Sequence, residues 1–356
     1  MDNLAHALVG AALGRAVADR HVARAGLIGA VAANAPDWCE IFTGYFHWTR
    51  ADFLLHHRGI THALIAAPLE IAGLILIIGF GARWWTRRRG GTPPPWVWLT
   101  ACVAITQLSH LFMDWQGSYG WRPFLPWDGT WYYLDWVAIA DPFFWLVPLT
   151  ALAWGANRHW LPLSGTALIG AAITFIIMRF VTGGGGVARW VLPVLAGLCL
   201  VAIVGWIAYW FGPVRRQRAA LLALLVLACY SSAQGVAVRH RKQVIQQEAQ
   251  RRFGVGAGYA ALTEVGRPFT WEAIYASTDT VASDDWRVPR HLDVPLVVRA
   301  LRQTPNGYAM NVFARFLTAD VDSSGGAHQP ATVYLRDARY ARVARSGWAV
   351  LRVRME

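Results

Sequence analysis

A run of seven residues, His56-His57-Arg58-Gly59-Ile60-Thr61-His62, places three histidines and an arginine at the start of an apolar stretch. A second polar group closes the next apolar stretch, where His110 and Asp114 are four residues apart and so share one face of a helix. Asp37 and His6 add a carboxylate and an imidazole from earlier segments. Neutral imidazole and carboxylate are the ligands that zinc, manganese and iron take in proteins. The pattern therefore predicts a metal site assembled from separate segments.

Each candidate ligand also has a purely structural interpretation. His6 could lie at a membrane interface, and Asp37 could cap the turn that follows Pro36. A histidine or an aspartate in an apolar segment is nevertheless costly in a membrane, and such residues usually mark functional sites. We therefore expect metal ligation by two aspartates and four histidines: His6, Asp37, His57, His62, His110 and Asp114.

An arginine and two acidic residues are candidates for the remaining chemistry. Arg58 cannot ligate a metal, but its guanidinium fork suits a phosphate or a carboxylate beside one, with anchoring to a lipid headgroup as the alternative. A free carboxylate, Asp135 or Glu40, is the expected general base. Asp135 could instead orient a ligating histidine through a hydrogen bond.

The composition is that of a membrane protein. Of 356 residues, 55% are hydrophobic and 15% are charged, whereas soluble domains carry about 25% charged residues. The net charge is +12, and Lys242 is the single lysine. Much of the arginine lies in short loops between apolar stretches, which indicates membrane topology and contact with anionic lipids rather than nucleic-acid binding.

Two short apolar stretches, residues 4–18 and 22–36, open the chain and predict a tight helical hairpin. Each is short for a full crossing, which takes about 20 residues, and their glycines suit close helix packing in lipid. The expected fold of residues 1–238 is a polytopic all-α membrane bundle of six to eight segments. Longer apolar stretches predict spans at about 62–80, 96–113, 136–154, 162–181, 188–211 and 219–238.

The arginine-rich loops predict which way the bundle faces. The loops with Arg87-Arg88-Arg89 and Arg215-Arg216-Gln217-Arg218 lie on one side of the expected bundle, and the positive-inside rule makes that side cytoplasmic. His62 begins one span and His110 ends the next, so both lie on the other side. We expect a multi-pass membrane protein with the site and the C-terminal domain on the outer face, which is the periplasmic face of the inner membrane if the host is a Gram-negative bacterium.

The composition changes after residue 238, and residues 239–356 predict a small, soluble, β-rich domain. Residues 240–253 are rich in glutamine and arginine and predict a short polar helix. Alternating apolar and polar runs follow, from Phe269 to Tyr275 and later in the chain. Asn306-Gly307 predicts a hairpin turn, with a strand from Tyr308 to Phe316.

Four motifs in this order resemble one family: Asn3-Leu4-Ala5-His6, Pro36-Asp37, the HRGITH block of residues 57–62, and His110-x-x-x-Asp114. The chain resembles the bacterial inner-membrane-associated, metal-dependent hydrolases, also described as LexA-binding hydrolases, over about residues 1–160. The resemblance implies that the six candidate ligands bind metal and that the site hydrolyses its substrate. Ala5 and Trp38 depart from that family, whose members usually carry threonine and commonly a second acid there.

The histidine and aspartate spacing is more distantly similar to zinc-dependent phospholipase C. That likeness implies a multinuclear zinc site that cleaves phosphodiesters. Trp38 stands where the family commonly has a second acid, so one candidate ligand for a second metal is missing. The combined expectation is a hydrolase that uses zinc, manganese or iron on a lipid-like or phosphoester substrate in the membrane. The alternative is a non-enzymatic membrane protein with a structural metal, whose C-terminal domain binds a partner.

Overall fold

The computed structural model describes residues 1–38, 49–154, 170, 172, 187–208, 213–323 and 330–355. The chain divides into two compact units. The first, here called the helical unit, comprises Met1–Trp38, Thr61–Ala237 and Thr263–Thr270. The second, here called the β unit, comprises Cys39–Ile60, Val238–Leu262 and Trp271–Glu356. Glu40 lies outside the described residues, as does the expected span at 162–181 apart from two isolated positions.

The helical unit begins with the predicted hairpin, formed by α1 (Asn3–Ala18) and α2 (Ala25–Ala33). The Asp2 carboxylate caps α1 by accepting hydrogen bonds from two backbone amides in its first turn. The backbones of the two helices are in direct contact. A Cβ at Gly10 would lie only 2.5 Å from the carbonyl oxygen of Gly29, so a larger residue would not fit there. Glycines at the contact therefore allow the close approach that the sequence predicted.

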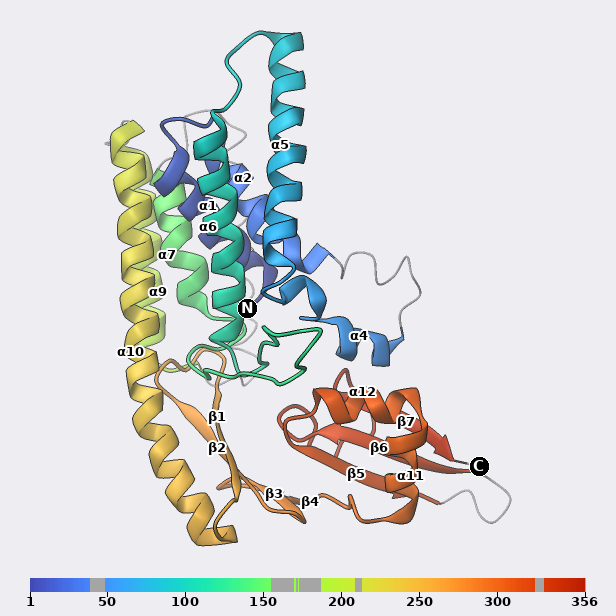
Figure 1. The fold of residues 1–356 in the computed structure, drawn as a ribbon. Helices are drawn as coiled ribbons and strands as arrows, with labels where there is room; N and C mark the ends of the chain where they lie inside the picture. The colour runs from blue at the N-terminus through green and yellow to red at the C-terminus, as the bar shows by residue number, and fades with distance from the viewer. Residues whose placement is uncertain are drawn as a thin grey trace. The chain divides into compact units, whose positions relative to one another are not determined.

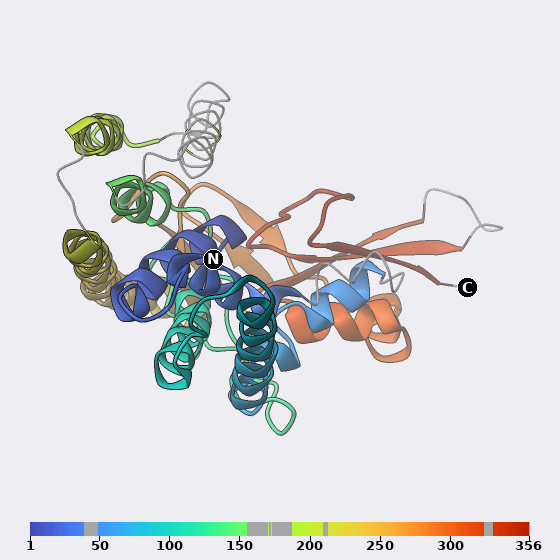
Figure 2. The same cartoon turned by 90° about the horizontal axis from the view of Figure 1, so that it is seen from above.

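Three helices among the described residues are long and apolar enough to cross a membrane: α5 (Ala67–Arg89), α6 (Trp96–Trp115) and most of α10 (Pro213–Phe253). α5 and α6 lie side by side in both ribbon views (Figures 1 and 2). α7 (Pro142–Trp154) and α9 (Val191–Ala208) are apolar and shorter. The N-terminal region is thus helical, with three candidate spans.

α10 differs from the prediction. The expected span at 219–238 and the expected polar helix at 240–253 form a single helix of 41 residues. The sequence has no proline after Pro213 in this stretch to end the helix between them. Figure 1 shows α10 as one continuous coil.

Short elements connect the long helices of the helical unit. The 3₁₀ turns η1 (Ala35–Asp37) and η2 (Ile60–His62) precede longer segments. A loop follows α6 and is closed by an isolated bridge in which Trp121 and Tyr132 exchange backbone hydrogen bonds of 3.0 and 2.8 Å. Two of the predicted ligands therefore lie in turns rather than in spanning helices.

Among its described residues, the β unit contains α4 (Arg50–His56), the C-terminal part of α10, seven strands and two later helices, α11 (Pro295–Gln303) and α12 (Pro305–Phe313). The first sheet has the order β1-β2-β3-β4 and the second β5-β6-β7. α11 and α12 pack on the second sheet (Figure 1). The strands are β1 (Gly258–Thr263), β2 (Trp271–Ala276), β3 (Thr280–Ala282), β4 (Arg287–Pro289), β5 (Leu317–Asp322), β6 (Ala331–Asp337) and β7 (Val350–Met355).

The predicted hairpin at Asn306-Gly307 is wrong. Both residues lie in the first turn of α12, and the expected strand at Tyr308 to Phe316 is replaced by α12 and the approach to β5. Thr304 caps α12 by accepting a hydrogen bond from the Gly307 amide at 3.0 Å, and Pro305 occupies the first turn. Gly307 is needed because a Cβ there would lie 2.0 Å from the carbonyl oxygen of Ala300.

Candidate metal centre

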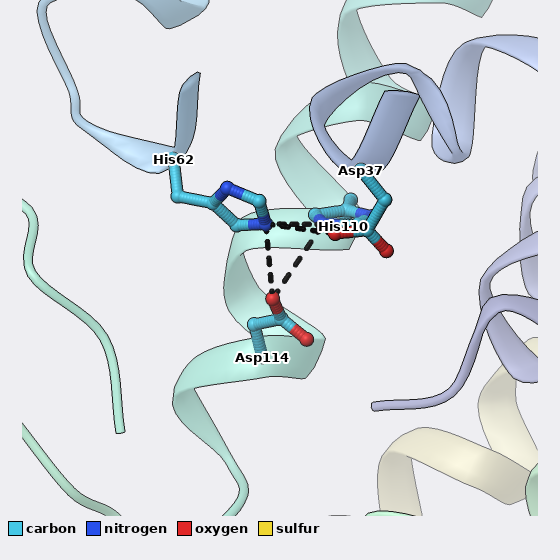
Figure 3. Close-up of side chains that lie close together, drawn as sticks. All are labelled: Asp37, His62, His110 and Asp114. Atoms are coloured by element: carbon cyan, nitrogen blue, oxygen red, sulfur yellow. Dashed lines mark hydrogen bonds and ion pairs between the residues drawn. The ribbon is translucent and has the colours of Figure 1, made fainter. Parts of the chain in front are cut away.

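Four buried side chains of the helical unit converge on one point (Figure 3). Asp37, His62, His110 and Asp114 each present one potential ligand atom, and these atoms all lie within 4.8 Å of one another. The side chains of His62 and His110 are fully buried, and the two carboxylates are nearly so. The structure therefore brings together four of the six predicted ligands.

The elements explain why these four side chains meet. His110 and Asp114 lie one turn apart on α6, so both project from the same face of that helix. Asp37 ends the 3₁₀ turn η1, which follows directly from α2. His62 ends the turn η2, just before α5 begins. One helix and two turns thus supply the four ligand atoms.

The distances within the group are those of atoms that share a small space. His62 Nε2 lies 3.1 Å from Asp37 Oδ1 and 3.3 Å from Asp114 Oδ2. The Nε2 atoms of His62 and His110 are 3.0 Å apart, and His110 Nε2 lies 3.5 Å from Asp114 Oδ2. Two imidazole nitrogens this close cannot both carry a proton toward each other. Two nitrogen and two carboxylate donors around one point are a ligand set that zinc accepts.

Hydrogen bonds outside the group hold the two imidazoles in place. His110 Nδ1 lies 2.6 Å from the carbonyl oxygen of Ala33, to which it donates, so Nε2 is left with a lone pair toward the group. His62 Nδ1 lies 3.1 Å from the Thr61 hydroxyl. Trp121 Nε1 donates to the carbonyl oxygen of His62 at 2.6 Å. Such bonds fix ring orientation in metal sites.

The charges of the group shift the pKa values of its members in opposite directions. Burial opposes protonation of His62, but its hydrogen bonds to Asp114 and Asp37 prevail and raise its pKa to about 9. Burial would raise the pKa of Asp37, but the hydrogen bond with His62 lowers it below its usual range. Without a metal, a proton on His62 takes the role that a cation would otherwise fill.

His6 lies at the edge of the group. It is fully buried, and its ring stacks on that of His110 at a centroid distance of 3.8 Å. Its Nε2 atom lies 3.2 Å from Asp114 Oδ1, which also contacts the amine of Met1. Asp114 therefore turns one oxygen toward His62 and His110 and the other toward His6. Ligation of metal by His6 stays a prediction.

Three other predicted site residues are not members of the four-residue group. His57 and Arg58 belong to the β unit, where the His57 ring stacks on Phe53 at 4.9 Å and Arg58 is buried with a φ of 50°. Asp135 belongs to the helical unit and is fully buried with a φ of 57° in the loop after α6. The roles of His57, Arg58 and Asp135 stay predictions.

Two polar contacts near the group were not predicted from the sequence. The indole of Trp121 donates to the backbone carbonyl of His62, so it holds that backbone in place. Gln107 donates from Nε2 to Glu70 Oε2 at 2.6 Å, which joins α6 to α5. A glutamine one turn before His110 and a lone acid early in α5 were the signals available in the sequence.

The first half of the chain matches a known protein family. The sequence profile of the YdjM inner membrane protein family matches residues 1–185, which include all the candidate ligands and α1 to α7. Neither the curated proteins nor the solved structures contain a match. The match covers more than half of the chain and confirms the resemblance noted in the sequence. The chain therefore belongs to the YdjM inner membrane protein family.

Proposed function

We propose that this protein is a metal-dependent hydrolase of the inner membrane that acts on a phosphoester or another lipid-like substrate. The observation that carries the proposal is the buried group of Asp37, His62, His110 and Asp114. Two carboxylates brought together in an apolar bundle are unfavourable unless a cation or protons compensate them. Membership of an inner-membrane family supports a substrate that is found at the bilayer.

The ligand set fits a divalent cation that is intermediate between hard and soft, and so binds both nitrogen and oxygen ligands. Imidazole and carboxylate suit zinc, and manganese and iron accept the same ligands. The cation would lower the pKa of a bound water and polarise the scissile group. Zinc is our first choice, because His110 Nδ1 is engaged by a carbonyl and leaves Nε2 to ligate, as is usual for zinc-bound histidine.

The remaining residues are given roles that follow from their chemistry. We assign Arg58, four residues before His62, to the anionic part of the substrate. We assign Asp135 to accept the proton of the attacking water. We also propose a multi-pass topology with the site and the C-terminal region on the periplasmic face, on the basis of the arginine-rich loops.

A structural metal site is the second candidate, and one observation favours it. Four protein ligands can complete a tetrahedral zinc site, whereas catalytic zinc sites keep a position open for water. In that case the metal would hold η1 and η2 against α6, and the C-terminal region would bind a partner. The two candidates differ in whether phosphoesters are hydrolysed, not in whether metal binds.

The test measures bound metal and hydrolysis on the same detergent-purified protein. After loading with zinc, we expect about one metal per chain or more and hydrolysis of bis(p-nitrophenyl) phosphate or a short-chain phospholipid. His62→Ala should lose the metal and reduce the rate at least about a hundredfold. The matched control is His21→Ala. The His21 ring stacks on Trp98 at a centroid distance of 4.2 Å and is not part of the metal group, so this variant should leave both readouts unchanged.

Each other outcome selects a different conclusion. Stoichiometric metal without hydrolysis of either substrate class would reject the hydrolase and favour the structural site. No metal after reloading would reject both candidates.

A further inference from the structure

A carboxylate and an amide from two neighbouring candidate spans form a pair that the metal group does not use. Glu70 is the single acidic residue of α5, and Gln107 is fully buried in α6. Gln107 Nε2 donates to Glu70 Oε2 at 2.6 Å. Ionisable residues within apolar helices are rare and usually mark functional sites.

The pair leaves one acceptor unsatisfied. A carboxylate only accepts hydrogen bonds, so Glu70 fixes the amide of Gln107 with its nitrogen toward Glu70 and its oxygen facing away. Gln107 Oε1 is buried and has no hydrogen-bond partner among the described residues. The amide that donates to Glu70 also brings its oxygen into the bundle, and a buried acceptor is unfavourable when it has no donor. The arrangement therefore lacks a donor group.

The pair lies beside the metal group. Gln107 precedes His110 by three residues on α6, so their side chains are neighbours on one face of that helix. Glu70 interacts electrostatically with His62. Glu70 is only half-buried, so a ligand can reach it. A group held here would lie about one helical turn from the metal ligands.

The geometry restricts the kind of group that fits. The width of one amide and the 2.6 Å hydrogen bond place Gln107 Oε1 within about 5 Å of Glu70 Oε2, less than two hydrogen-bond lengths. A single donor group can therefore bridge both oxygens if it carries at least two hydrogens. A hydroxyl carries one, whereas a primary ammonium carries three and also matches the negative charge of Glu70.

We propose that Glu70 and Gln107 form a subsite for a primary ammonium group on a substrate whose phosphoryl group lies at the metal centre. The substrate class is then an aminoalkyl phosphoester, as in a phosphoethanolamine headgroup, in which two carbons separate phosphate and ammonium. This inference rests on the proposed hydrolase function and specifies its substrate.

The test compares two small ligands on the full-length, zinc-loaded protein in a neutral detergent. Phosphoethanolamine and propyl phosphate have the same length, and they differ in that an ammonium replaces a methyl group. Isothermal titration calorimetry should show that wild type binds phosphoethanolamine roughly tenfold or more tightly than propyl phosphate. In Glu70→Gln that ratio should fall to about one, with zinc content and propyl phosphate affinity unchanged. In Gln107→Leu it should fall several-fold.

The control and the contrary results separate this inference from the function on which it rests. Glu264→Gln makes the same change at an acid paired with exposed Arg267, and it should keep the wild-type ratio. Zinc and propyl phosphate binding with no preference for phosphoethanolamine would overturn the subsite alone, as would a preference that survives Glu70→Gln. Failure to bind zinc or either phosphate would overturn the proposed function and the subsite together.

Discussion

Each unit of the molecule buries a group of charged side chains, and the two groups are completed in different ways. In the β unit, Asp337 and Arg339 both have fully buried side chains. Arg339 donates to Asp337 Oδ2 from Nε at 2.9 Å and from Nη2 at 2.7 Å. Backbone amides of Arg315 and Arg339 each add a hydrogen bond of 3.0 Å to the same carboxylate. This carboxylate is neutralised and hydrogen-bonded by its own chain.

In the helical unit, Asp37 and Asp114 face two imidazoles instead of a guanidinium. An imidazole supplies a full positive charge only when it is protonated, and two Nε2 atoms 3.0 Å apart cannot both be protonated toward one another. Asp114 also contacts the amine of Met1, so the charges facing the two carboxylates come from an amine and from imidazoles rather than from a guanidinium. The comparison teaches that burial alone does not identify a functional site, whereas buried carboxylates that share one point with imidazole nitrogens indicate a place for an external cation.

The same substitution in both groups gives the largest expected effects, with opposite readouts. Asp114→Asn should lower zinc affinity roughly a hundredfold or more, because a charged ligand is lost, while the metal-free protein still folds. Asp337→Asn should leave zinc binding unchanged but lower the free energy of unfolding by about 3–5 kcal/mol, because Arg339 is left as an uncompensated buried charge. Metal analysis and urea denaturation measure the two effects. Zinc lost equally in both variants would contradict the contrast between the groups.

The sequence predicts the part of the metal group that depends on helix periodicity. His110 and Asp114 were paired by their spacing of four residues, and that pair lies on one face of α6 as expected. Asp37 and His62 lie in 3₁₀ turns, where helix periodicity does not apply. Their metal ligation is predicted from their residue types and from the family resemblance. Glu70 was missed because a single acid in an apolar run gives no sign of its partner.

The β unit shows how a strong local signal can be overridden. Asn-Gly is the best short signal for a hairpin, but Thr304 and Pro305 start a helix at the same place. The contact of Gly307 with the backbone of α11 depends on tertiary packing, which a local pattern does not contain. The alternation of apolar residues from Phe269 to Tyr275 predicts a strand, and β2 confirms it over Trp271–Ala276.

A substitution at the α1–α2 contact should affect the metal group without touching it. A Cβ at Gly29 would lie 2.2 Å from the carbonyl oxygen of Gly10, so Gly29→Ala must displace one helix. We expect a loss of about 1–3 kcal/mol in the free energy of unfolding. Weaker zinc binding should accompany it, because α2 carries the Ala33 carbonyl that orients His110 and leads into Asp37.

Gly73→Ala is the matched control for that experiment. Nothing lies within 4 Å of a Cβ at Gly73 in α5, and alanine favours a helix over glycine by about 1 kcal/mol. This variant should be neutral or slightly stabilising and should keep its zinc affinity. Equal effects of the two substitutions would show that the close contact of α1 and α2 does not support the metal group.

A pH dependence confined to the metal group also distinguishes it from the Asp337–Arg339 pair. His62, with its pKa raised to about 9, must lose its proton before it can ligate, so zinc affinity should rise about tenfold per pH unit from pH 6 to about pH 9. The metal-free protein should show the opposite trend. Because the pKa of His62 is raised on folding, its stabilising contribution is complete below about 6.5 and is lost as pH rises through about 9. Competition with a chelator and urea denaturation at each pH measure the two slopes, and a flat zinc profile would contradict ligation by His62.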